Sequence, residues 1–157
     1  MSMERAKAQL EKKGFLDRII EPEIPTATVA EAAAALGCDP SHIAKTLAFY
    51  AKYNQGVILV VAAGDAKIDN RRFKEKFGVK ARLLDAIDVE PMTGHEIGGV
   101  CPFGVNDDVK VYCDVSLQRF DTVYPAAGNA HSGVRLSCAE LFRAADALEW
   151  VNVCKGI

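Results

Sequence analysis

The chain has 157 residues, a formal net charge of −2, and 50% hydrophobic against 25% charged residues. This length fits one domain, and this balance is typical of a globular protein with an apolar core. The charge excludes a globally basic nucleic-acid coat protein, although one basic face stays possible. No apolar run approaches the ~20 residues that span a bilayer, and the start shows no signal-peptide core, so we expect a cytoplasmic protein.

The five cysteines are scattered, odd in number and never arranged as C-x-x-C. This usage predicts reduced thiols and argues against both a disulfide framework and a structural zinc site.

Helix and strand signals alternate in the first half of the chain. Thr28 and Glu31 form a capping box that predicts a helix over 29–36, and the apolar run 57–63 predicts a buried central strand. Asp39 and Pro40 predict a short helix that leads to Lys45, at the entrance of a strand. We also expect helices at 3–13 and 69–77 and strands at 15–20, 46–50 and 81–84.

The helix predicted over 69–77 has a basic outer side, with Arg71, Arg72 and Lys74. A run of this kind is often only a solvated helix face. The alternative is a footprint for a phosphate backbone, which needs clustered cations rather than a basic protein overall.

The second half of the chain predicts more strands than helices. A capping box at Ser137 and Glu140 begins a helix that runs to Ala145, and Ser116 is expected to cap a single turn. We expect a further helix at 85–93 and strands at 109–114, 122–124, 134–136 and 148–153. The chain therefore predicts one mixed α/β domain over 1–157, with six or seven strands.

A glycine-rich stretch over 94–105 is the strongest candidate for a functional loop. It reads GHEIGGVCPFGV, and it contains too many poor helix formers for a helix and a proline that a central strand would not accept. One interpretation is a tight turn. The other is a loop whose bare N–H groups bind an anion or a polarised carbonyl.

Familiar catalytic motifs are absent from the sequence. There is no G-x-S-x-G elbow and no P-loop, and the three histidines lack metal-ligand spacing, so we expect neither metal nor cofactor. Cys101 could be a nucleophile activated by His95 or His131, or it could simply be a small packed side chain.

Three features in this order resemble the YbaK family: Lys45-Thr46-Leu47, the GGVCPFG core of the glycine-rich stretch, and the second loop at 128–133. That family includes free-standing aminoacyl-tRNA deacylases and the editing insertion of bacterial prolyl-tRNA synthetases. The resemblance covers nearly the whole chain. It implies an α/β fold with a mixed, mostly antiparallel, barrel-like sheet flanked by helices.

The resemblance also implies site residues. Lys45 would lie near the 3′-terminal adenosine of the tRNA, and 98–102 would bind the ester carbonyl through backbone amides. The implied catalytic set is Lys45, Gly98, Gly99, Val100 and Cys101, and the implied substrate-binding set is Thr46, Pro102, Phe103, Gly104, Gly128, Asn129 and His131. Arg71, Arg72 and Lys74 are the expected tRNA-binding residues.

The implied activity is the hydrolysis of mischarged aminoacyl-tRNA, with alanine or cysteine on tRNA for proline as the expected substrates. An aminoacyl ester is already activated, so amides that stabilise the oxyanion, worth roughly 3–4 kcal/mol per donor, leave little need for a side-chain triad. A prolyl-tRNA synthetase is a possible partner. Two alternatives stay open: a non-catalytic tRNA-binding module, and a regulatory partner of a synthetase.

Overall fold

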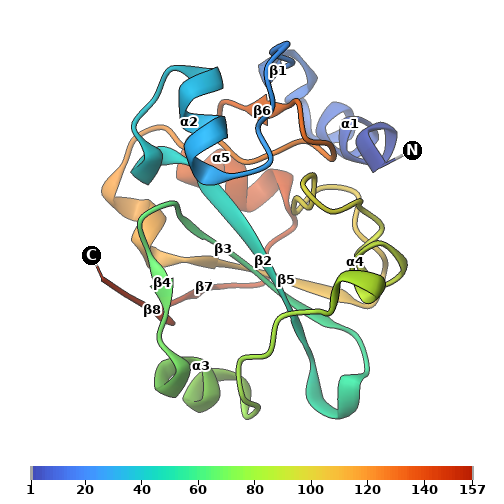
Figure 1. The fold of residues 1–157 in the computed structure, drawn as a ribbon, viewed down its shortest axis with the longest axis vertical. Helices are drawn as coiled ribbons and strands as arrows, with labels where there is room; N and C mark the ends of the chain where they lie inside the picture. The colour runs from blue at the N-terminus through green and yellow to red at the C-terminus, as the bar shows by residue number, and fades with distance from the viewer. Residues whose placement is uncertain (1, 157) are drawn as a thin grey trace.

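The fold is built around a four-stranded sheet with the strand order β2-β3-β5-β7 (Figure 1). The computed structural model describes residues 2–156. The central strands are β2 (Ala44–Tyr50), β3 (Val57–Ala63), β5 (Val109–Asp114) and β7 (Trp150–Val151). Two further pairs of short strands lie outside this sheet: β1 (Ile19–Ile20) with β6 (Gly133–Val134), and β4 (Lys67–Ile68) with β8 (Cys154–Lys155).

Five α-helices surround the sheets within the described residues. In Figure 1, α1, α2 and α5 gather near β1 and β6 in the upper part of the view, while α3 lies at the lower left, below β4 and β8. The helices are α1 (Ser2–Lys13), α2 (Val29–Leu36), α3 (Asn70–Phe77), α4 (Ala86–Thr93) and α5 (Cys138–Ala144). None of them is long and apolar enough to cross a membrane.

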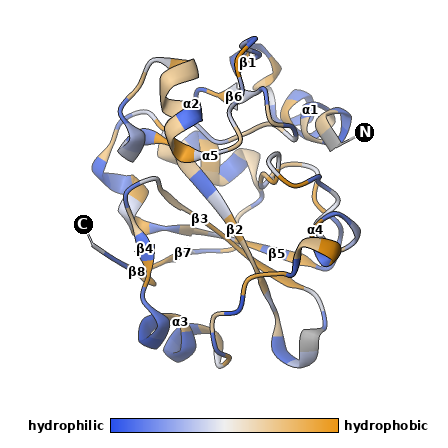
Figure 2. Cartoon of the chain, in the orientation of Figure 1, coloured by the Kyte–Doolittle hydropathy of each residue, from blue (hydrophilic) through white to orange (hydrophobic). Residues whose placement is uncertain are grey.

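The sheet corrects the expected architecture in two respects. It is open and does not close into a barrel. Only β2 and β3 are antiparallel, whereas β3–β5 and β5–β7 are parallel, so the main sheet is not mostly antiparallel. A parallel central strand is usually covered on both faces, and every residue of β3 is buried. The continuous orange of β3 in Figure 2 shows the same property.

Local signals predicted the helices correctly. Thr28 and Glu31 form the expected capping box at α2, and Ser137 and Glu140 form the one at α5. The side chain of Asp69 accepts a hydrogen bond from the amide of Arg72 and so caps α3.

Several strand predictions were wrong. Residues 81–84 form no strand, because Leu83 makes only an isolated bridge to Phe49. The expected strands at 15–20, 122–124, 134–136 and 148–153 shrink to one or two paired residues each, and β4 and β8 were missed.

Ser116 is not a cap: Asp114 accepts from the Ser116 amide at 2.9 Å and caps the short 3₁₀ helix Val115–Arg119.

The two faces of β2 meet different helices. Phe49 packs on Phe73 of α3 with ring centroids 4.6 Å apart, while the neighbouring Tyr50 hydroxyl donates to Asp85 at 3.1 Å, at the start of α4. Successive strand residues point to opposite faces. The α3 face of β2 therefore carries Lys45 and Leu47, and the α4 face carries Thr46.

Candidate active site

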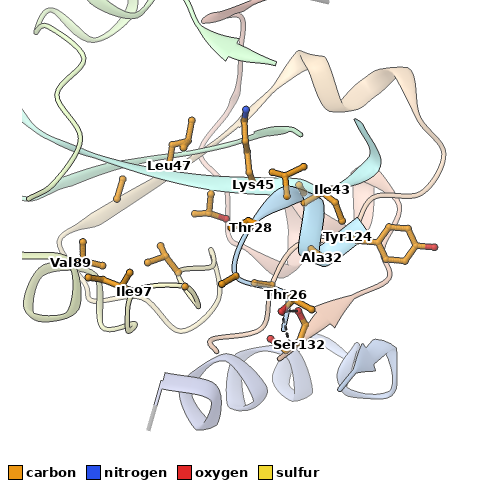
Figure 3. Close-up of a pocket in the computed structure, with 18 of the residues that line it drawn as sticks. Thr26, Thr28, Ala32, Ile43, Lys45, Leu47, Val89, Ile97, Tyr124 and Ser132 are labelled. Carbon is orange, nitrogen blue, oxygen red and sulfur yellow. Dashed lines mark hydrogen bonds between the residues drawn. The ribbon is translucent and has the colours of Figure 1, made fainter. Parts of the chain in front are cut away.

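A cavity of about 400 Å³ lies along the outer edge of β2. Residues 44–48 of this strand line it continuously, together with short segments around 26–29, 83–84, 97–100 and 124–126. β2 is an edge strand of the main sheet, so the cavity lies where the sheet ends. The close-up in Figure 3 shows Val89 and Ile97 on one side of the strand together with Thr26 and Ser132.

The cavity walls are mainly apolar, with Ile43, Leu84, Val89 and Ile97 among the lining residues. Thr26 and Ser132 also line it, but their polar groups are already used. The Thr26 hydroxyl donates to the Ser132 carbonyl and accepts from the Ser132 amide, both at 3.0 Å (Figure 3). A ligand in the cavity would therefore meet few free polar groups.

Thr46 is the exception among the polar lining residues. Its hydroxyl oxygen is buried and has no hydrogen-bond partner within the described part of the chain. A buried hydroxyl without a partner costs free energy. Such a group on a cavity wall is the kind of group that a ligand satisfies.

Lys45 lies inside β2 rather than before it, and its side chain extends away from Thr26 and Ser132 (Figure 3). Its ammonium group donates to the carbonyl of Ala66 and, at 3.4 Å, to that of Gly64. Burial lowers the pKa of Lys45 below its usual value. Both acceptors are neutral and Lys45 has no ion pair among residues 2–156, so its charge stays available to an anion.

The first half of the glycine-rich stretch borders the cavity through Ile97, Gly98 and Val100. Gly98 has a positive φ of 89°, which favours glycine. The Gly99 amide is already used, because it donates to the Glu96 carbonyl at 3.0 Å. The amides of Gly98 and Val100 have no acceptor among residues 2–156, so both are candidate donors for a ligand, and Val100 is the one next to the amide already used.

The second half of the stretch turns into the protein interior. Cys101 and Phe103 are 0% exposed, and Pro102 is buried beside them. Gly104 lies against α1, where its amide donates to the Gln9 side chain at 2.6 Å. Pro102, Phe103 and Gly104 do not line the cavity, so the structure separates these three predicted substrate-binding residues from it.

His95 anchors the second half of the glycine-rich stretch through a hydrogen bond to its backbone. It is 0% exposed, and its Nε2 lies 2.6 Å from the Phe103 carbonyl oxygen, which requires the proton on Nε2. Burial lowers the pKa of His95 below its usual value. Its Nδ1 is buried without a partner among the described residues.

The Cys101 thiol is not poised for nucleophilic attack. Its sulfur lies 3.5 Å from His95 Nε2, the nitrogen whose proton is directed at Phe103, so that nitrogen cannot act as a base. Burial raises the pKa of Cys101 to about 12. A thiol becomes a nucleophile as thiolate. The geometry therefore favours a packed side chain.

The second predicted loop, 128–133, packs against the glycine-rich stretch. A Cβ atom on Gly99 would lie 2.4 Å from the Cα of Asn129, so the two loops are in direct backbone contact. The Asn129 side chain accepts from the His131 amide at 2.8 Å and also contacts Met3 of α1. His131 is exposed, and neither it nor Gly128 or Asn129 lines the cavity.

The predicted tRNA-binding residues lie apart from the cavity on α3, which is the bluest helix in Figure 2. Arg71 pairs with Glu75 at 3.1 Å, and Arg72 donates to the Cys154 carbonyl at 2.5 Å. Lys74 has no ion pair within the described chain. The structure thus unites Lys45, Thr46, Gly98 and Val100 around one cavity and leaves the basic helix on the Lys45 side of β2.

Sequence reasoning missed Thr26, Tyr124 and Ser132 as cavity residues. Ser132 lies inside the second predicted loop, but no motif distinguished it from its neighbours. Thr26 and Tyr124 come from segments whose approach to β2 depends on long-range pairing, such as the bridge between Ile43 and Tyr124.

Comparison with known proteins gives a consistent result over this region. Residues 23–144 match the family described as "Aminoacyl-tRNA editing domain". The chain is 46% identical to the uncharacterized protein YwhH of Bacillus subtilis over 155 residues, which is 99% of this chain and 98% of YwhH. A 105-residue stretch is 26% identical to the proline–tRNA ligase of Bacillus cytotoxicus and spans 66% of this chain but 18% of that enzyme.

Solved structures agree with the sequence matches. One, described as a "putative trans-editing enzyme for prolyl tRNA synthetase", has a TM-score of 0.86 and 29% identity and covers 99% of this chain and 98% of its own. The hypothetical protein APE2540 has a TM-score of 0.84 and 31% identity, with 96% and 99% covered.

Proposed function

The chain belongs to the aminoacyl-tRNA editing domain family, and from this premise we propose that it is a free-standing deacylase that hydrolyses mischarged aminoacyl-tRNA. The observation that carries the proposal is the apolar cavity along β2, which has an unpaired Val100 amide on its border and a fixed cation on the same strand. A cavity of this kind accepts a small acyl group and leaves the tRNA outside. The proposed substrates are alanine and cysteine on tRNA for proline.

The chemistry follows from the polar groups at the cavity. Water attacks the ester carbonyl, the acyl–oxygen bond breaks, and the ribose hydroxyl leaves with a proton while the amino acid keeps the water oxygen. The Val100 amide stabilises the negative charge that develops on the carbonyl oxygen. The next residue, Cys101, is buried behind this amide. The neighbouring ribose hydroxyl or a bound water serves as the base, because no histidine or carboxylate side chain lines the cavity within residues 2–156.

Lys45 binds the 3′ end of the tRNA in this proposal. A lysine acts on phosphate as a point charge and needs no forked geometry. Lys45 and α3 lie on the same face of β2, so the tRNA would approach from the side of α3 and insert its acyl group past the edge of the strand. Arg71, Arg72 and Lys74 then meet the tRNA backbone.

The test is single-turnover deacylation of alanyl- and cysteinyl-tRNA for proline by the wild-type chain and by Lys45→Ala. We expect hydrolysis by the wild type and a loss of about tenfold or more in Lys45→Ala, since a charged hydrogen bond is removed. Lys67→Ala, which removes an exposed lysine on β4, is the control and should hydrolyse normally. Binding of tRNA without hydrolysis would instead identify a tRNA-binding module or a regulatory partner of a synthetase.

A further inference from the structure

The outer edge of β2 is paired at both of its ends. At the beginning, the Ala44 amide donates to the Tyr124 carbonyl at 3.1 Å. Toward the end, the Ala48 carbonyl accepts from Leu84 at 3.0 Å and the Tyr50 amide donates to Arg82 at 3.0 Å. Each of these three residues of β2 has an even number.

The backbone of Thr46 lies in the gap between these pairings. In an antiparallel pair, alternate residues bond to the neighbouring strand and the ones between them point outward. Because Ala44, Ala48 and Tyr50 bond outward, the N–H and C=O of Thr46 also point away from β3. Neither group has a partner outside the sheet among the described residues, and the Thr46 hydroxyl is unpaired as well.

The cavity occupies this gap. Its walls include residues 44–48 together with Tyr124 and Leu84, the residues that pair with β2 on either side of Thr46. The uncovered stretch of this edge is therefore short and centred on Thr46, which contributes one outward donor and one outward acceptor.

An aminoacyl ester has the complementary groups on one residue. In a narrow antiparallel pair, two facing residues exchange both of their N–H and C=O bonds. The α-ammonium group and the ester carbonyl of an aminoacyl-tRNA have the same relation to each other as the N–H and C=O of a strand residue. The side chain of the esterified amino acid then faces the apolar walls of the cavity.

We propose that Thr46 recognises the main-chain atoms of the aminoacyl group as a one-residue β-bridge: its carbonyl accepts from the α-ammonium group and its amide donates to the ester carbonyl. This inference rests on the proposed deacylase function and adds a second oxyanion donor beside Val100. It also defines the substrate class as esters of α-amino acids with a free amino group, because an N-acylated or α-hydroxy acid cannot donate the same charged hydrogen bond.

The first test compares three esters of one tRNA with the wild-type chain: alanyl, N-acetylalanyl and lactyl. Each enzymatic rate is divided by the uncatalysed hydrolysis rate of the same ester, because the α-ammonium group itself activates an ester. We expect the normalised rate to fall about tenfold or more for N-acetylalanyl- and lactyl-tRNA, since a hydrogen bond to a charged donor is lost. Equal normalised rates would overturn the assignment of Thr46, whereas no hydrolysis of any ester would overturn the proposed function itself.

The second test separates the groups of Thr46. Thr46→Val removes the hydroxyl and keeps the backbone donor, while Thr46→Pro also removes the outward N–H, a change that an edge strand tolerates. We expect kcat of Thr46→Pro to be about 100-fold below that of Thr46→Val, with similar melting temperatures. Equal kcat values in the two folded variants would overturn the role of the amide. If Thr46→Pro does not fold, the three-ester comparison decides the proposal alone.

Discussion

The two halves of the glycine-rich stretch look alike in sequence but are placed differently in the structure. Residues 97–100 border the cavity, with one amide used in a turn and the next one unpaired. Residues 101–104 are anchored in the core by His95 and against α1 by Gln9. A glycine-rich motif is therefore not a uniform cradle of donors: one half presents an amide and the other half fixes its position.

The largest effect is expected where the first half touches the second predicted loop. In Gly99→Ala, the added methyl group would lie 2.4 Å from the Cα of Asn129, so one backbone must move. We expect kcat to fall by about two to three orders of magnitude through displacement of Val100. Overpacking should also reduce the free energy of unfolding by about 1–3 kcal/mol. Single-turnover deacylation and thermal melting, measured side by side, test both.

The matched control is Gly78→Ala, at the end of α3. Gly78 has a φ of 74° and open space around its Cβ position, so this variant has backbone strain without a clash. It should lose about 1 kcal/mol and deacylate normally. If Gly99→Ala also loses stability but deacylates normally, residues 97–100 are only a turn.

His95 tests the anchoring half. His95→Ala leaves the Phe103 carbonyl unpaired and creates a cavity in the core, so we expect a loss of about 2–4 kcal/mol in stability. Activity at a temperature where the variant is folded should fall less than in Gly99→Ala, because His95 does not reach the cavity. Chemical denaturation together with deacylation would measure both.

The same histidine predicts a pH dependence. Burial lowers the pKa of His95 below its ordinary 6.5, so the unfolded chain binds a proton more readily than the folded one. This contribution to stability is present above pH 6.5 and is lost as the pH falls toward the pKa of the folded state. His95→Gln keeps a side-chain donor but cannot titrate, so it should lack this part of the slope. A wild-type slope in His95→Gln would assign the effect to other groups.

A moderate effect is expected from α3, which lies apart from both halves of the stretch. Reversing Arg71, Arg72 and Lys74 to glutamate should raise KM for tRNA and leave kcat nearly unchanged. The salt dependence of binding should become flatter by about one unit of slope for each tRNA phosphate that the helix no longer neutralises. An unchanged slope would mean that α3 is simply a solvated helix face.

The smallest effect is expected from Cys101→Ser, in the anchoring half. A thiol with a pKa of about 12 is almost entirely protonated at neutral pH, so we expect kcat to change by less than about threefold. Mass spectrometry of quenched reactions should find no acyl group on Cys101. A trapped acyl adduct, or an inactive but folded variant, would restore the nucleophile interpretation.

Sequence reasoning succeeded where structure is determined locally. Thr28 with Glu31 and Ser137 with Glu140 specify helix starts within four residues, and the apolar run 57–63 is long enough to indicate a buried strand. It failed at pairings between distant segments. The two-residue strands β4 and β8 pair Lys67 with Lys155 and Ile68 with Cys154, far apart in the chain, and have no periodicity of their own.

The candidate site likewise contains residues that sequence reasoning could select and residues that it could not. Lys45, Thr46 and the glycine-rich stretch belong to motifs, so the resemblance to a known family was enough to select them. The roles within the stretch could not be separated from sequence, because no local pattern shows that His95 holds Phe103 in the interior or that Gly104 lies against α1. The gap beside Thr46 depends on Tyr124 and Leu84, which bond to β2 from two different parts of the chain.

The short gap in the edge of β2 also bears on aggregation. An unprotected edge strand is a template on which a strand from another molecule can add. Here the segments at Tyr124 and at Arg82–Leu84 already cover both ends of β2. The uncovered part is centred on Thr46 and is too short for a strand of another chain to gain a ladder of hydrogen bonds. The protein can thus present unpaired backbone to a small ligand and still resist edge-to-edge association at high concentration.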